Sequence, residues 1–497
     1  MAKPIMIQGT MSNAGKSMIT AGLCRVFRQD GYSVAPFKSQ NMALNSFITD
    51  EGLEMGRAQV VQAEAAGVAP SVLMNPILLK PVTDMGSQVI VNGEVRGNMR
   101  AADYYNYKRK LIPDITRAFE TLSSRHDIIV IEGAGSPAEI NLKKDDIVNM
   151  GLAKMTGAPV LLVGDIDRGG VFAQLVGTLI LLDDDERGMV KGLIINKFRG
   201  DMEILRPGLA MLEEKSEKPV VGVLPYISVD IEDEDSLSGR FNKKPIDAAL
   251  DIAVIRLPKI SNFTDFMALE ATNGTGLRYA GNVRELGEPD MVIIPGTKNT
   301  ISDMKWMREN GLEARILRLA EQGVVLFGIC GGYQMLGLSI RDAGNLEGGG
   351  EIAGMGLLPV HTEFCPEKER LRSRGTITGA HNALAPLNGA VVEGYEIHMG
   401  KSIPENGAGA FLRLDNGAPD GCVNGNIAGT YMHGFFDSGA CREALIAALC
   451  EKKGIPLPGV RAFDFALYKQ EQFDKLAAAV RKHLDMPFIY RVLEGKG

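Results

Sequence analysis

The chain has 497 residues, of which 45% are hydrophobic and 23% charged, and its formal net charge is −7. This length predicts two to four domains, and the composition is that of an ordinary folded protein. The negative charge and the lack of a Lys/Arg run argue against nucleic-acid binding. Six scattered cysteines without a CxxC pair argue against a zinc site or a disulfide framework. Without a signal peptide or a membrane-length apolar run, we expect a cytoplasmic protein.

Short apolar runs alternate with helical patterns along the front half, which is typical of a parallel sheet covered by helices. A polar stretch from Asp230 to Asp247 then predicts a linker, which we place at 233–250. The strands predicted before this linker are Pro4–Gln8, Ser33–Phe37, Asp127–Ile131, Pro159–Val163, Gly192–Ile195 and Val220–Leu224.

A second alternating series follows the linker, with helices expected near Thr300–Gln322 and Gly439–Lys453. The segment from Phe463 to Leu484 has a helical pattern and could pack on either domain. The strands predicted in this half are Asp251–Leu257, Met291–Ile294, Val324–Phe327 and Ile427–Tyr431. The sequence thus predicts two tandem α/β domains, at 1–232 and 251–450, with a helical extension at 451–497.

The first predicted strand leads into a glycine-rich segment, Gly9–Ser17, which is followed by helical periodicity. In such a turn, backbone N–H groups converge on phosphate oxygens at the positive end of a helix. Lys16 would reach the terminal phosphates, and the Ser17 hydroxyl would bind Mg²⁺. Five residues separate Gly9 from Gly15, one more than in the standard phosphate loop. The nucleotide-binding residues predicted here are Gly9, Thr10, Asn13, Ala14, Gly15, Lys16 and Ser17.

Charged residues also follow several of the other predicted strands in this half. Lys38 follows the second strand, Glu132 ends the third, and Asp165 and Asp167 end the fourth. Ligands of open α/β sheets lie beyond the carboxyl ends of the strands, so we expect these loops to meet over the phosphate loop. A carboxylate there can hold Mg²⁺, and a lysine can neutralise charge on a transferring phosphoryl group.

In the second half, the strand Val324–Phe327 leads into Gly328-Ile329-Cys330-Gly331-Gly332. This is the nucleophile-elbow pattern with cysteine in place of serine, and a helix N-terminus stabilises a thiolate. His433, directly after a predicted strand, is the preferred base, and His398 is the second choice. The backbone N–H groups of Gly331 and Gly296 would supply the oxyanion hole.

Taken together, these motifs resemble the cobyric acid synthase family of cobalamin-biosynthesis amidotransferases, from Ile5 to about Leu484. The front half is similar to dethiobiotin synthetase, which has the same lengthened phosphate loop. The back half is similar to flavodoxin-like class I (triad) glutamine amidotransferases. The stretches that carry the resemblance are Gly9–Ser17, Pro36–Ser46, Arg57–Pro70, Glu132–Leu142, Gly164–Ala173 and Asn196–Asp201.

The resemblance implies amidation of the b, d, e and g carboxylates of adenosylcobyrinic acid a,c-diamide, a cobalt corrinoid, with ATP, Mg²⁺ and glutamine. It implies phosphate contacts for Lys38, a base contact for Asn196, and Mg²⁺ ligation by Asp50 and Glu132. Triad amidotransferases have a Glu two residues after the histidine, but this chain has Phe435 there. Glu396 and Asp437 remain alternatives for orienting His433.

The expected reaction has two parts: Cys330 and His433 release ammonia from glutamine, and the other domain makes an acyl phosphate that ammonia attacks. We expect small-molecule partners, without nucleic acid or membrane, and leave homo-oligomerisation open. The rival hypotheses are the a,c-diamide synthase, another two-domain amidoligase, and a P-loop regulatory ATPase. The regulatory reading leaves the Cys330 elbow and His433 unexplained.

Overall fold

The computed structural model describes residues 1–83, 86–231, 248–405, 407–456 and 463–496. Its internal contacts divide the chain into two compact units. The first comprises residues 1–43, 54–232 and 467–497, and the second comprises residues 44–53 and 233–466. The predicted domains were consecutive ranges, whereas each unit is assembled from separate stretches. The predicted linker at 233–250 lies largely outside the described residues.

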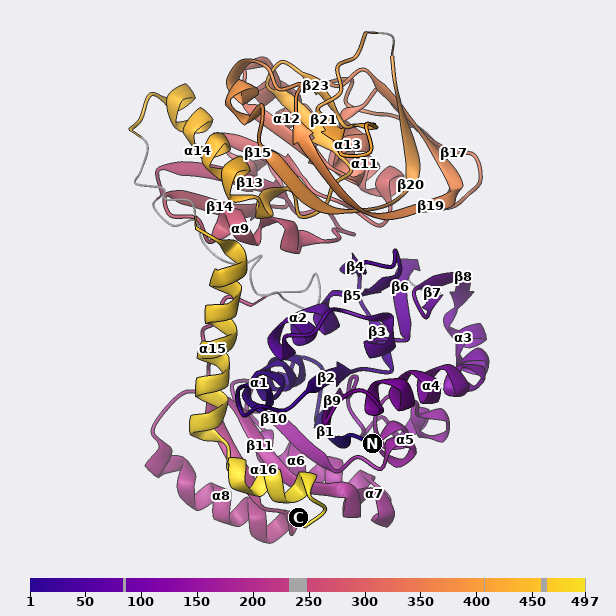
Figure 1. The fold of residues 1–497 in the computed structure, drawn as a ribbon, viewed down its shortest axis with the longest axis vertical. Helices are drawn as coiled ribbons and strands as arrows, with labels where there is room; N and C mark the ends of the chain where they lie inside the picture. The colour runs from indigo at the N-terminus through magenta and orange to yellow at the C-terminus, as the bar shows by residue number, and fades with distance from the viewer. Residues whose placement is uncertain (84–85, 232–247, 406, 457–462, 497) are drawn as a thin grey trace. The chain divides into compact units, whose positions relative to one another are not determined.

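A parallel six-stranded sheet forms the centre of the first unit, in the order β12-β11-β10-β1-β9-β2 (Figure 1). The six strands predicted from apolar runs in the front half are all present. All five residues of β9 are buried, as expected for a parallel sheet covered on both faces. The strands are β1 (Lys3–Gly9), β2 (Val34–Phe37), β9 (Ile128–Glu132), β10 (Val160–Asp165), β11 (Val190–Phe198) and β12 (Val220–Pro225).

Helices of the first unit connect these strands, and α1 starts directly after the glycine-rich segment. Gly15 precedes α1 with φ +99°, a left-handed backbone conformation that L side chains rarely adopt. The helices are α1 (Lys16–Gln29), α2 (Arg57–Ala66), α3 (Ala101–Tyr107), α4 (Ile112–Ser123), α5 (Met150–Thr156), α6 (Val171–Leu181), α7 (Asp184–Met189) and α8 (Met202–Ser216), with 3₁₀ turns η1 (Val72–Met74), η2 (Lys108–Leu111) and η3 (Ile140–Asp145).

A second, smaller sheet in this unit was not predicted from the sequence. Its strands follow the order β3-β6-β7-β8, and β8 is mostly exposed and carries charged residues, so it lacks the apolar run of a buried strand. The strands are β3 (Gln40–Met42), β6 (Ile77–Thr83), β7 (Gly86–Val91) and β8 (Glu94–Arg100), and the short strand β5 (Glu54–Gly56) also belongs to this unit.

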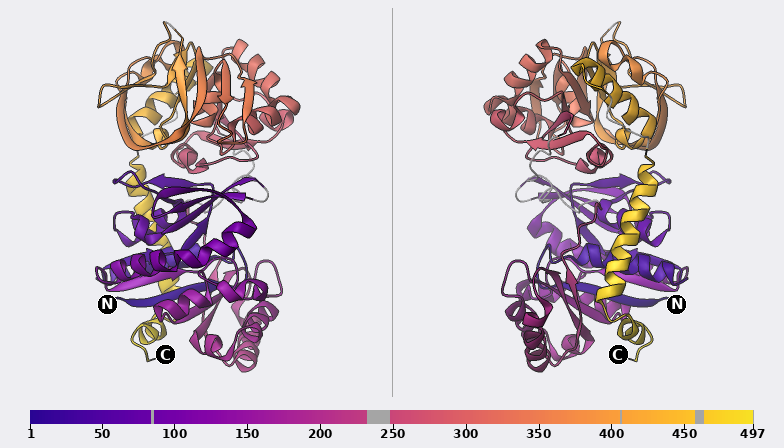
Figure 2. Two further views of the ribbon diagram at one scale, coloured as in Figure 1. Left: turned by 90° about the vertical axis from the view of Figure 1, so that its right-hand side faces the viewer. Right: turned by 90° about the vertical axis from the view of Figure 1, so that its left-hand side faces the viewer.

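The predicted C-terminal helical tail is confirmed, and it packs on the first unit. The tail consists of α15 (Phe465–His483) and α16 (Met486–Leu493), shown in yellow in Figures 1 and 2. Arg25 of α1 pairs with Asp474 of α15 at 2.8 Å. Buried apolar residues of the tail, such as Val480, join the core of the phosphate-loop sheet. The tail is therefore part of the same unit as the glycine-rich segment, although it lies at the other end of the sequence.

The second unit has its own central sheet, in the order β14-β13-β15-β16-β24-β23, which is parallel except for β23. The four predicted strands are present, whereas β14 and β23 were missed. The strands are β13 (Leu250–Ile255), β14 (Thr275–Ala280), β15 (Met291–Ile294), β16 (Val325–Ile329), β23 (Cys422–Asn424) and β24 (Ile427–Thr430).

The helical pattern predicted near Thr300–Gln322 is two helices, α11 (Thr300–Glu309) and α12 (Leu312–Glu321). The helix predicted at Gly439–Lys453 is present as α14, with the same bounds. The remaining helices are α9 (Met267–Glu270), α10 (Val283–Leu286) and α13 (Gly331–Leu336), with 3₁₀ turns η5 (Phe263–Phe266), η6 (Asn382–Leu387) and η7 (Phe435–Asp437).

A second sheet in this unit, built around the long antiparallel pair β19 and β20, was not predicted. Much of β19 alternates between buried and exposed residues instead of forming an apolar run. Its strands are β17 (Ser339–Asp342), β18 (Gly350–Ala353), β19 (Val360–Ile377), β20 (Val391–Pro404), β21 (Leu412–Leu414) and β22 (Pro419–Asp420).

A short segment from the front of the sequence, residues 44–53, also belongs to the second unit and contains β4 (Ser46–Ile48). The backbone N–H of Ser46 donates to Asn262 Oδ1 at 3.0 Å. The backbone carbonyl of Ser46 accepts from the Tyr395 hydroxyl at 3.0 Å, and the Phe47 ring packs edge-on against Tyr395. These contacts tie the segment to β20 and to the loop after β13.

Candidate functional site

The glycine-rich segment of the first unit forms a tight turn between β1 and α1, as predicted. A Cβ on Gly15 would lie 2.0 Å from Asn196 Nδ2, so only glycine fits this position. The Lys16 ammonium donates to the carbonyl oxygens of Met11 and Gly135, both at 3.0 Å. The lysine therefore lies across the turn, within the set of loops that follow the strands.

A buried carboxylate accepts hydrogen bonds from other residues that were predicted for the phosphate site. Glu132, at the end of β9, is fully buried. Its Oε1 accepts from the Ser17 hydroxyl and from the Lys38 ammonium, both at 2.8 Å. Its Oε2 accepts from the side-chain amide of Gln62 on α2. Ser17, Lys38 and Glu132 are therefore brought together, and Gln62 is an additional member that our sequence analysis did not identify.

The Ser17 hydroxyl and the Glu132 carboxylate offer the hard oxygen ligands that Mg²⁺ prefers, so these two residues fit the predicted metal site. Asp50 belongs to residues 44–53, which are part of the second unit, and its metal ligation stays a prediction. Its side chain is 85% exposed, and its carboxylate is 3.9 Å from the Arg372 guanidinium. The contacts of the first unit thus group two of the three predicted metal ligands.

Asn196, predicted to contact the nucleotide base, lies at the end of β11 and supports the phosphate loop. Its Nδ2 donates to the Ala14 carbonyl at 2.9 Å. The next residue, Lys197, donates to the Asn13 carbonyl at 2.6 Å and to the buried Asp165 carboxylate at 2.8 Å. Thr10 is fixed by hydrogen bonds to Val163 and Gln174. These contacts fix the loop's conformation, and the base contact of Asn196 stays a prediction.

In the second unit, Cys330 occupies the sharp turn between β16 and α13. Its backbone φ is +52°, which is unusual for a residue with a side chain and typical of a strained nucleophile elbow. A Cβ on Gly332 would lie 1.9 Å from the Ile294 carbonyl oxygen, so the turn requires glycine there. The Cys330 thiol lies 3.8 Å from the Ile397 carbonyl oxygen. It thus stands at a helix N-terminus beside β20.

His433 is buried next to this cysteine and is oriented by a carboxylate that the sequence analysis did not identify. Its Nδ1 donates to Asp265 Oδ2 at 2.7 Å, and Asp265 Oδ1 accepts the Gly434 N–H at 3.1 Å. Asp265 lies in η5 and is 4% exposed. A hydrogen bond on Nδ1 leaves the other ring nitrogen for chemistry. Cys330, His433 and Asp265 therefore have the arrangement of a catalytic triad.

The surroundings of His433 favour its protonated form. Burial alone lowers the pKa of this imidazole, but the charge and hydrogen bond of Asp265 and the contact with Cys330 raise it to about 10. An imidazolium beside a cysteine stabilises the thiolate, which is the nucleophilic form. The electrostatics therefore suit a thiolate–imidazolium pair.

The two glycines predicted for the oxyanion hole flank the same place. Gly331 is the first residue of α13, where a backbone N–H has no acceptor within the helix. A Cβ on Gly331 would lie 3.2 Å from the Thr297 backbone nitrogen, so the loop after β15 is adjacent. A Cβ on Gly296 would lie 3.2 Å from the His433 ring. This neighbourhood suits the predicted role, which stays a prediction.

His398, the second choice for the base, has a different environment. Its ring stacks on Tyr431 with the centroids 3.7 Å apart, and Nδ1 lies 2.7 Å from the Gly400 carbonyl oxygen. Glu396, one of the two alternatives for orienting His433, instead accepts from the Ser373 hydroxyl at 2.6 Å and faces His398 at 3.4 Å. The carboxylate that is hydrogen-bonded to His433 Nδ1 is that of Asp265, whereas the sequence had left Glu396 and Asp437 as alternatives for this contact.

Comparison with known proteins gives two domain matches. Residues 5–237 match the CobQ/CobB/MinD/ParA nucleotide binding domain, and residues 251–441 match the CobB/CobQ-like glutamine amidotransferase domain. With the two sites above, these matches define a glutamine amidotransferase that carries a nucleotide-binding domain.

Proteins named cobyric acid synthase match nearly the whole chain. Identity is 58% for the protein of Lachnoclostridium phytofermentans, over 99% of both chains. It is 59% for that of Ruminiclostridium cellulolyticum, over 99% of this chain and 98% of the relative. It is 52% for that of Clostridium acetobutylicum, over 99% of both. The chain belongs to the cobyric acid synthase family, and it is accordingly a glutamine-hydrolysing ligase of cobalamin biosynthesis that uses ATP.

Where the structure describes the chain, no helix has the length and apolar character needed to cross a membrane.

Proposed function

We propose that this enzyme amidates the b, d, e and g carboxylates of adenosylcobyrinic acid a,c-diamide and forms adenosylcobyric acid. Each amidation would consume one ATP and one glutamine. The observation that carries the proposal is the buried His433–Asp265 pair beside Cys330, in a chain that also holds Ser17, Lys38 and Glu132 at a phosphate loop. One centre is suited to release ammonia and the other to activate a carboxylate.

At the glutamine centre, the Cys330 thiolate attacks the side-chain amide carbon of glutamine, and a C–S bond forms. The backbone N–H groups of Gly331 and Gly296 bind the oxyanion of the tetrahedral intermediate. His433 gives its proton to the departing nitrogen, so ammonia leaves and a glutamyl thioester remains. His433 then removes a proton from water, which attacks the thioester and releases glutamate.

At the nucleotide centre, a carboxylate oxygen of the corrinoid attacks the γ-phosphorus of ATP, and the bond from that phosphorus to the bridging oxygen breaks. ADP leaves, and the product is an acyl phosphate. Lys16 and Lys38 offset the negative charge that develops on the phosphoryl oxygens. Ser17 and Glu132 would hold Mg²⁺, which neutralises phosphate charge when bound. Ammonia then attacks the acyl carbon, and phosphate leaves.

Asp265→Asn is expected to lower glutaminase activity by roughly 10²- to 10⁴-fold, because an amide neither stabilises the imidazolium nor fixes the correct tautomer. It should also change the pH profile. Burial lowers the pKa of His433, but Asp265 together with Cys330 raises it above its usual 6.5, to about 10, so His433 stays protonated until the pH rises through that value. Without this carboxylate, the alkaline loss of activity should move to lower pH, as measured by glutamate release between pH 6 and 10.

Asp437→Asn is the matched control for this measurement, because Asp437 is the nearby acid that the sequence left as an alternative. In this variant, glutamate release should be lost at the same alkaline pH as in the unsubstituted enzyme. A shift in Asp437→Asn with none in Asp265→Asn would show that the wrong carboxylate has been assigned.

Glu132→Gln is expected to raise the Mg²⁺ concentration needed for half-maximal synthesis, because an amide is a weaker ligand than a carboxylate for a hard divalent cation. Glutamine hydrolysis alone should be unaffected by the substitution. The readout is ADP formation with corrinoid and ammonia over a range of Mg²⁺ concentrations. An unchanged Mg²⁺ dependence would remove Glu132 from the metal site.

The decisive experiment for the overall proposal follows the corrinoid by mass spectrometry. With ATP and glutamine, the mass of adenosylcobyrinic acid a,c-diamide should fall in four small equal steps, because each amidation replaces a carboxyl OH by the slightly lighter NH2. Amidation of cobyrinic acid at the a and c positions, with no reaction of the diamide, would instead identify an a,c-diamide synthase. ATP hydrolysis without any amide product would favour a regulatory ATPase.

A further inference from the structure

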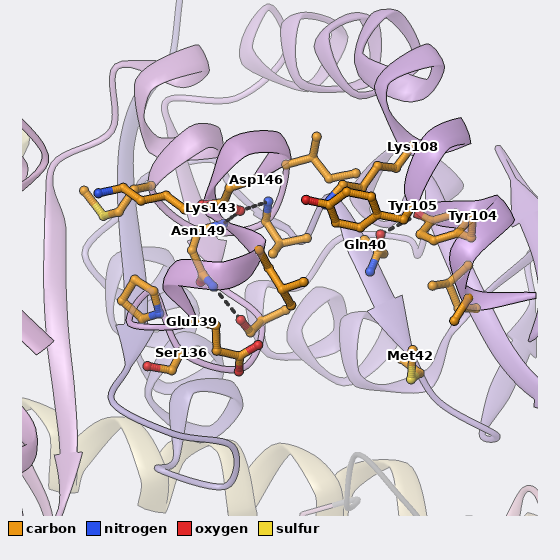
Figure 3. Close-up of a pocket in the computed structure, with 18 of the residues that line it drawn as sticks. Gln40, Met42, Tyr104, Tyr105, Lys108, Ser136, Glu139, Lys143, Asp146 and Asn149 are labelled. Carbon is orange, nitrogen blue, oxygen red and sulfur yellow. Dashed lines mark hydrogen bonds between the residues drawn. The ribbon is translucent and has the colours of Figure 1, made fainter. Parts of the chain in front are cut away.

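The first unit contains a pocket of about 210 Å³ that is lined in part by residues following β9 (Figure 3). One side is formed by Gln40 and Met42 of β3, and another by Tyr104, Tyr105 and Lys108 near the end of α3. The opposite wall is the chain that follows β9, from Ala134 to Met150. Within that stretch, only Gly135, which does not itself line the pocket, contacts a residue of the nucleotide site described above.

The wall after β9 joins this pocket directly to the phosphate site. Ala134 and Ser136 line the pocket and follow Glu132 closely in the chain. Between them, the Gly135 carbonyl accepts from the Lys16 ammonium at 3.0 Å. The Asn149 side chain holds the Ala134 carbonyl at 2.6 Å from the pocket side. A group in the pocket would therefore be separated from Lys16 by the backbone of residues 134–136.

Three acidic residues line the pocket, Glu139, Asp146 and Glu186, and Glu139 is exposed. Asp146 accepts backbone N–H groups from Val148, Asn149 and Gly151, at 2.8 to 3.0 Å. Glu186 pairs with Lys143 at 2.7 Å and with Lys154 at 3.1 Å. The backbone donors of Asp146 fix the fold of the wall, and the charge of Glu186 is offset by the two lysines.

The opposite side offers polar groups suited to a carboxylate or carboxamide. The Tyr104 hydroxyl donates to Gln40 Oε1, which orients both side chains at the cavity. The Lys108 ammonium lies 4.2 Å from the centroid of the Tyr105 ring, which holds it beside an aromatic face. Burial lowers the pKa of Lys108, against the opposing effect of Asp145 and Asp146. A partly desolvated ammonium gains from an anionic ligand more than an exposed one does.

The edge of the pocket is apolar. Met42 and Leu142 both line it, and they are 57% and 42% exposed. Exposed apolar side chains around a polar interior are suited to a ligand with a broad hydrophobic body and short polar arms.

We propose that this pocket binds the corrinoid substrate, with Lys108 receiving a carboxylate-bearing side chain, Tyr104 orienting Gln40 beside it, and Met42 and Leu142 contacting the macrocycle edge. The proposal rests on the proposed function and adds the place where the substrate is held. A corrinoid is a flat, largely apolar ring fringed with carboxylate and amide arms, which matches this distribution of groups.

The test is Lys108→Met, with Lys110→Met as the matched control, because Lys110 is an exposed lysine two residues away that does not line the pocket. We expect Lys108→Met to raise the KM for adenosylcobyrinic acid a,c-diamide by roughly 10- to 100-fold, the effect of losing a hydrogen bond to a charged group. The KM for ATP and the rate of glutamine hydrolysis should not change. Tyr104→Phe should weaken binding in the same direction and by less.

Equilibrium dialysis separates carboxylate recognition from a general loss of structure. The unsubstituted enzyme should bind the a,c-diamide more tightly than the product that has lost the b, d, e and g carboxylates. Lys108→Met should abolish most of that difference, and Lys110→Met should preserve it. Equal effects on both corrinoids, or no effect on either, would overturn the pocket assignment. If the unsubstituted enzyme bound but never amidated the diamide, the proposed function would fail instead.

Discussion

Replacing Cys330 with serine is expected to lower glutamine-dependent amidation by at least about 10³-fold while ammonia-dependent amidation continues near the unsubstituted rate. The reason is that the thiolate is the attacking group, and a serine hydroxyl beside His433 is a far weaker nucleophile toward an amide. Added ammonia bypasses this step, because activation of the carboxylate takes place at the phosphate loop. Product formation with glutamine or with an ammonium salt, measured at the same pH, gives the comparison.

Cys365→Ser is the matched control, since Cys365 is a half-buried cysteine of β19 outside the proposed triad. It should retain both activities. Full glutamine-dependent turnover in Cys330→Ser would mean that Cys330 is not the nucleophile. Loss of the ammonia route as well would mean that the substitution damages more than glutamine hydrolysis, which a thermal unfolding curve would reveal.

Replacing Lys16 with alanine should have the opposite pattern, with loss of both nitrogen routes by roughly 10²- to 10³-fold and survival of basal glutamine hydrolysis. The Lys16 ammonium is the charge that the phosphate loop presents to the transferring phosphoryl group. The ammonium also donates to two backbone carbonyls, at Met11 and Gly135, which hold it across the loop. The measurements are ADP release with corrinoid and ammonia, and glutamate release without corrinoid.

An exposed lysine such as Lys215, on α8, provides the comparison for this substitution. Lys215→Ala should keep both activities within twofold of the unsubstituted enzyme, as is usual for surface positions. If Lys16→Ala still released ADP at the normal rate, the glycine-rich segment would not be the site of phosphoryl transfer. The two substitutions, Cys330→Ser and Lys16→Ala, together separate the centre that makes ammonia from the centre that uses it.

The parts of this molecule that could be predicted from sequence are those with a strong local signal. Buried parallel strands are continuous apolar runs, so β1 and β9 stand out in the sequence. The turns at Gly15 and Cys330 each require a backbone conformation or a close approach that only a few residue types allow, and this requirement leaves a readable pattern. The residues brought together at Glu132 were also predictable, because parallel strands end at one edge of a sheet.

Asp265 and Gln62 could not be identified in this way. Asp265 lies 168 residues before His433, and no spacing rule connects them. Its only sequence signal is its place in the loop after β13, at the same edge of the sheet as the elbow. Gln62 lies within the Arg57–Pro70 stretch that resembles the family, but a glutamine on a helix has no chemical signature of its own. The strand β19 was missed because the middle of its sequence, from Pro366 to Arg374, is rich in charged residues and has no apolar run.

The position of residues 44–53 means that this enzyme cannot be divided at its middle. The backbone passes between the two units at 43/44, 53/54, 232/233 and 466/467, so a fragment starting after the nucleotide-binding half would lack β4. The Asn262 amide oxygen and the Tyr395 hydroxyl would then lose Ser46 as a partner. Asn262 lies three residues from Asp265, and the Tyr395 ring stacks beside His433. An excised glutaminase half would therefore lose contacts next to Asp265 and His433. A gene split at this point would have to supply residues 44–53 in trans for the glutaminase half to work.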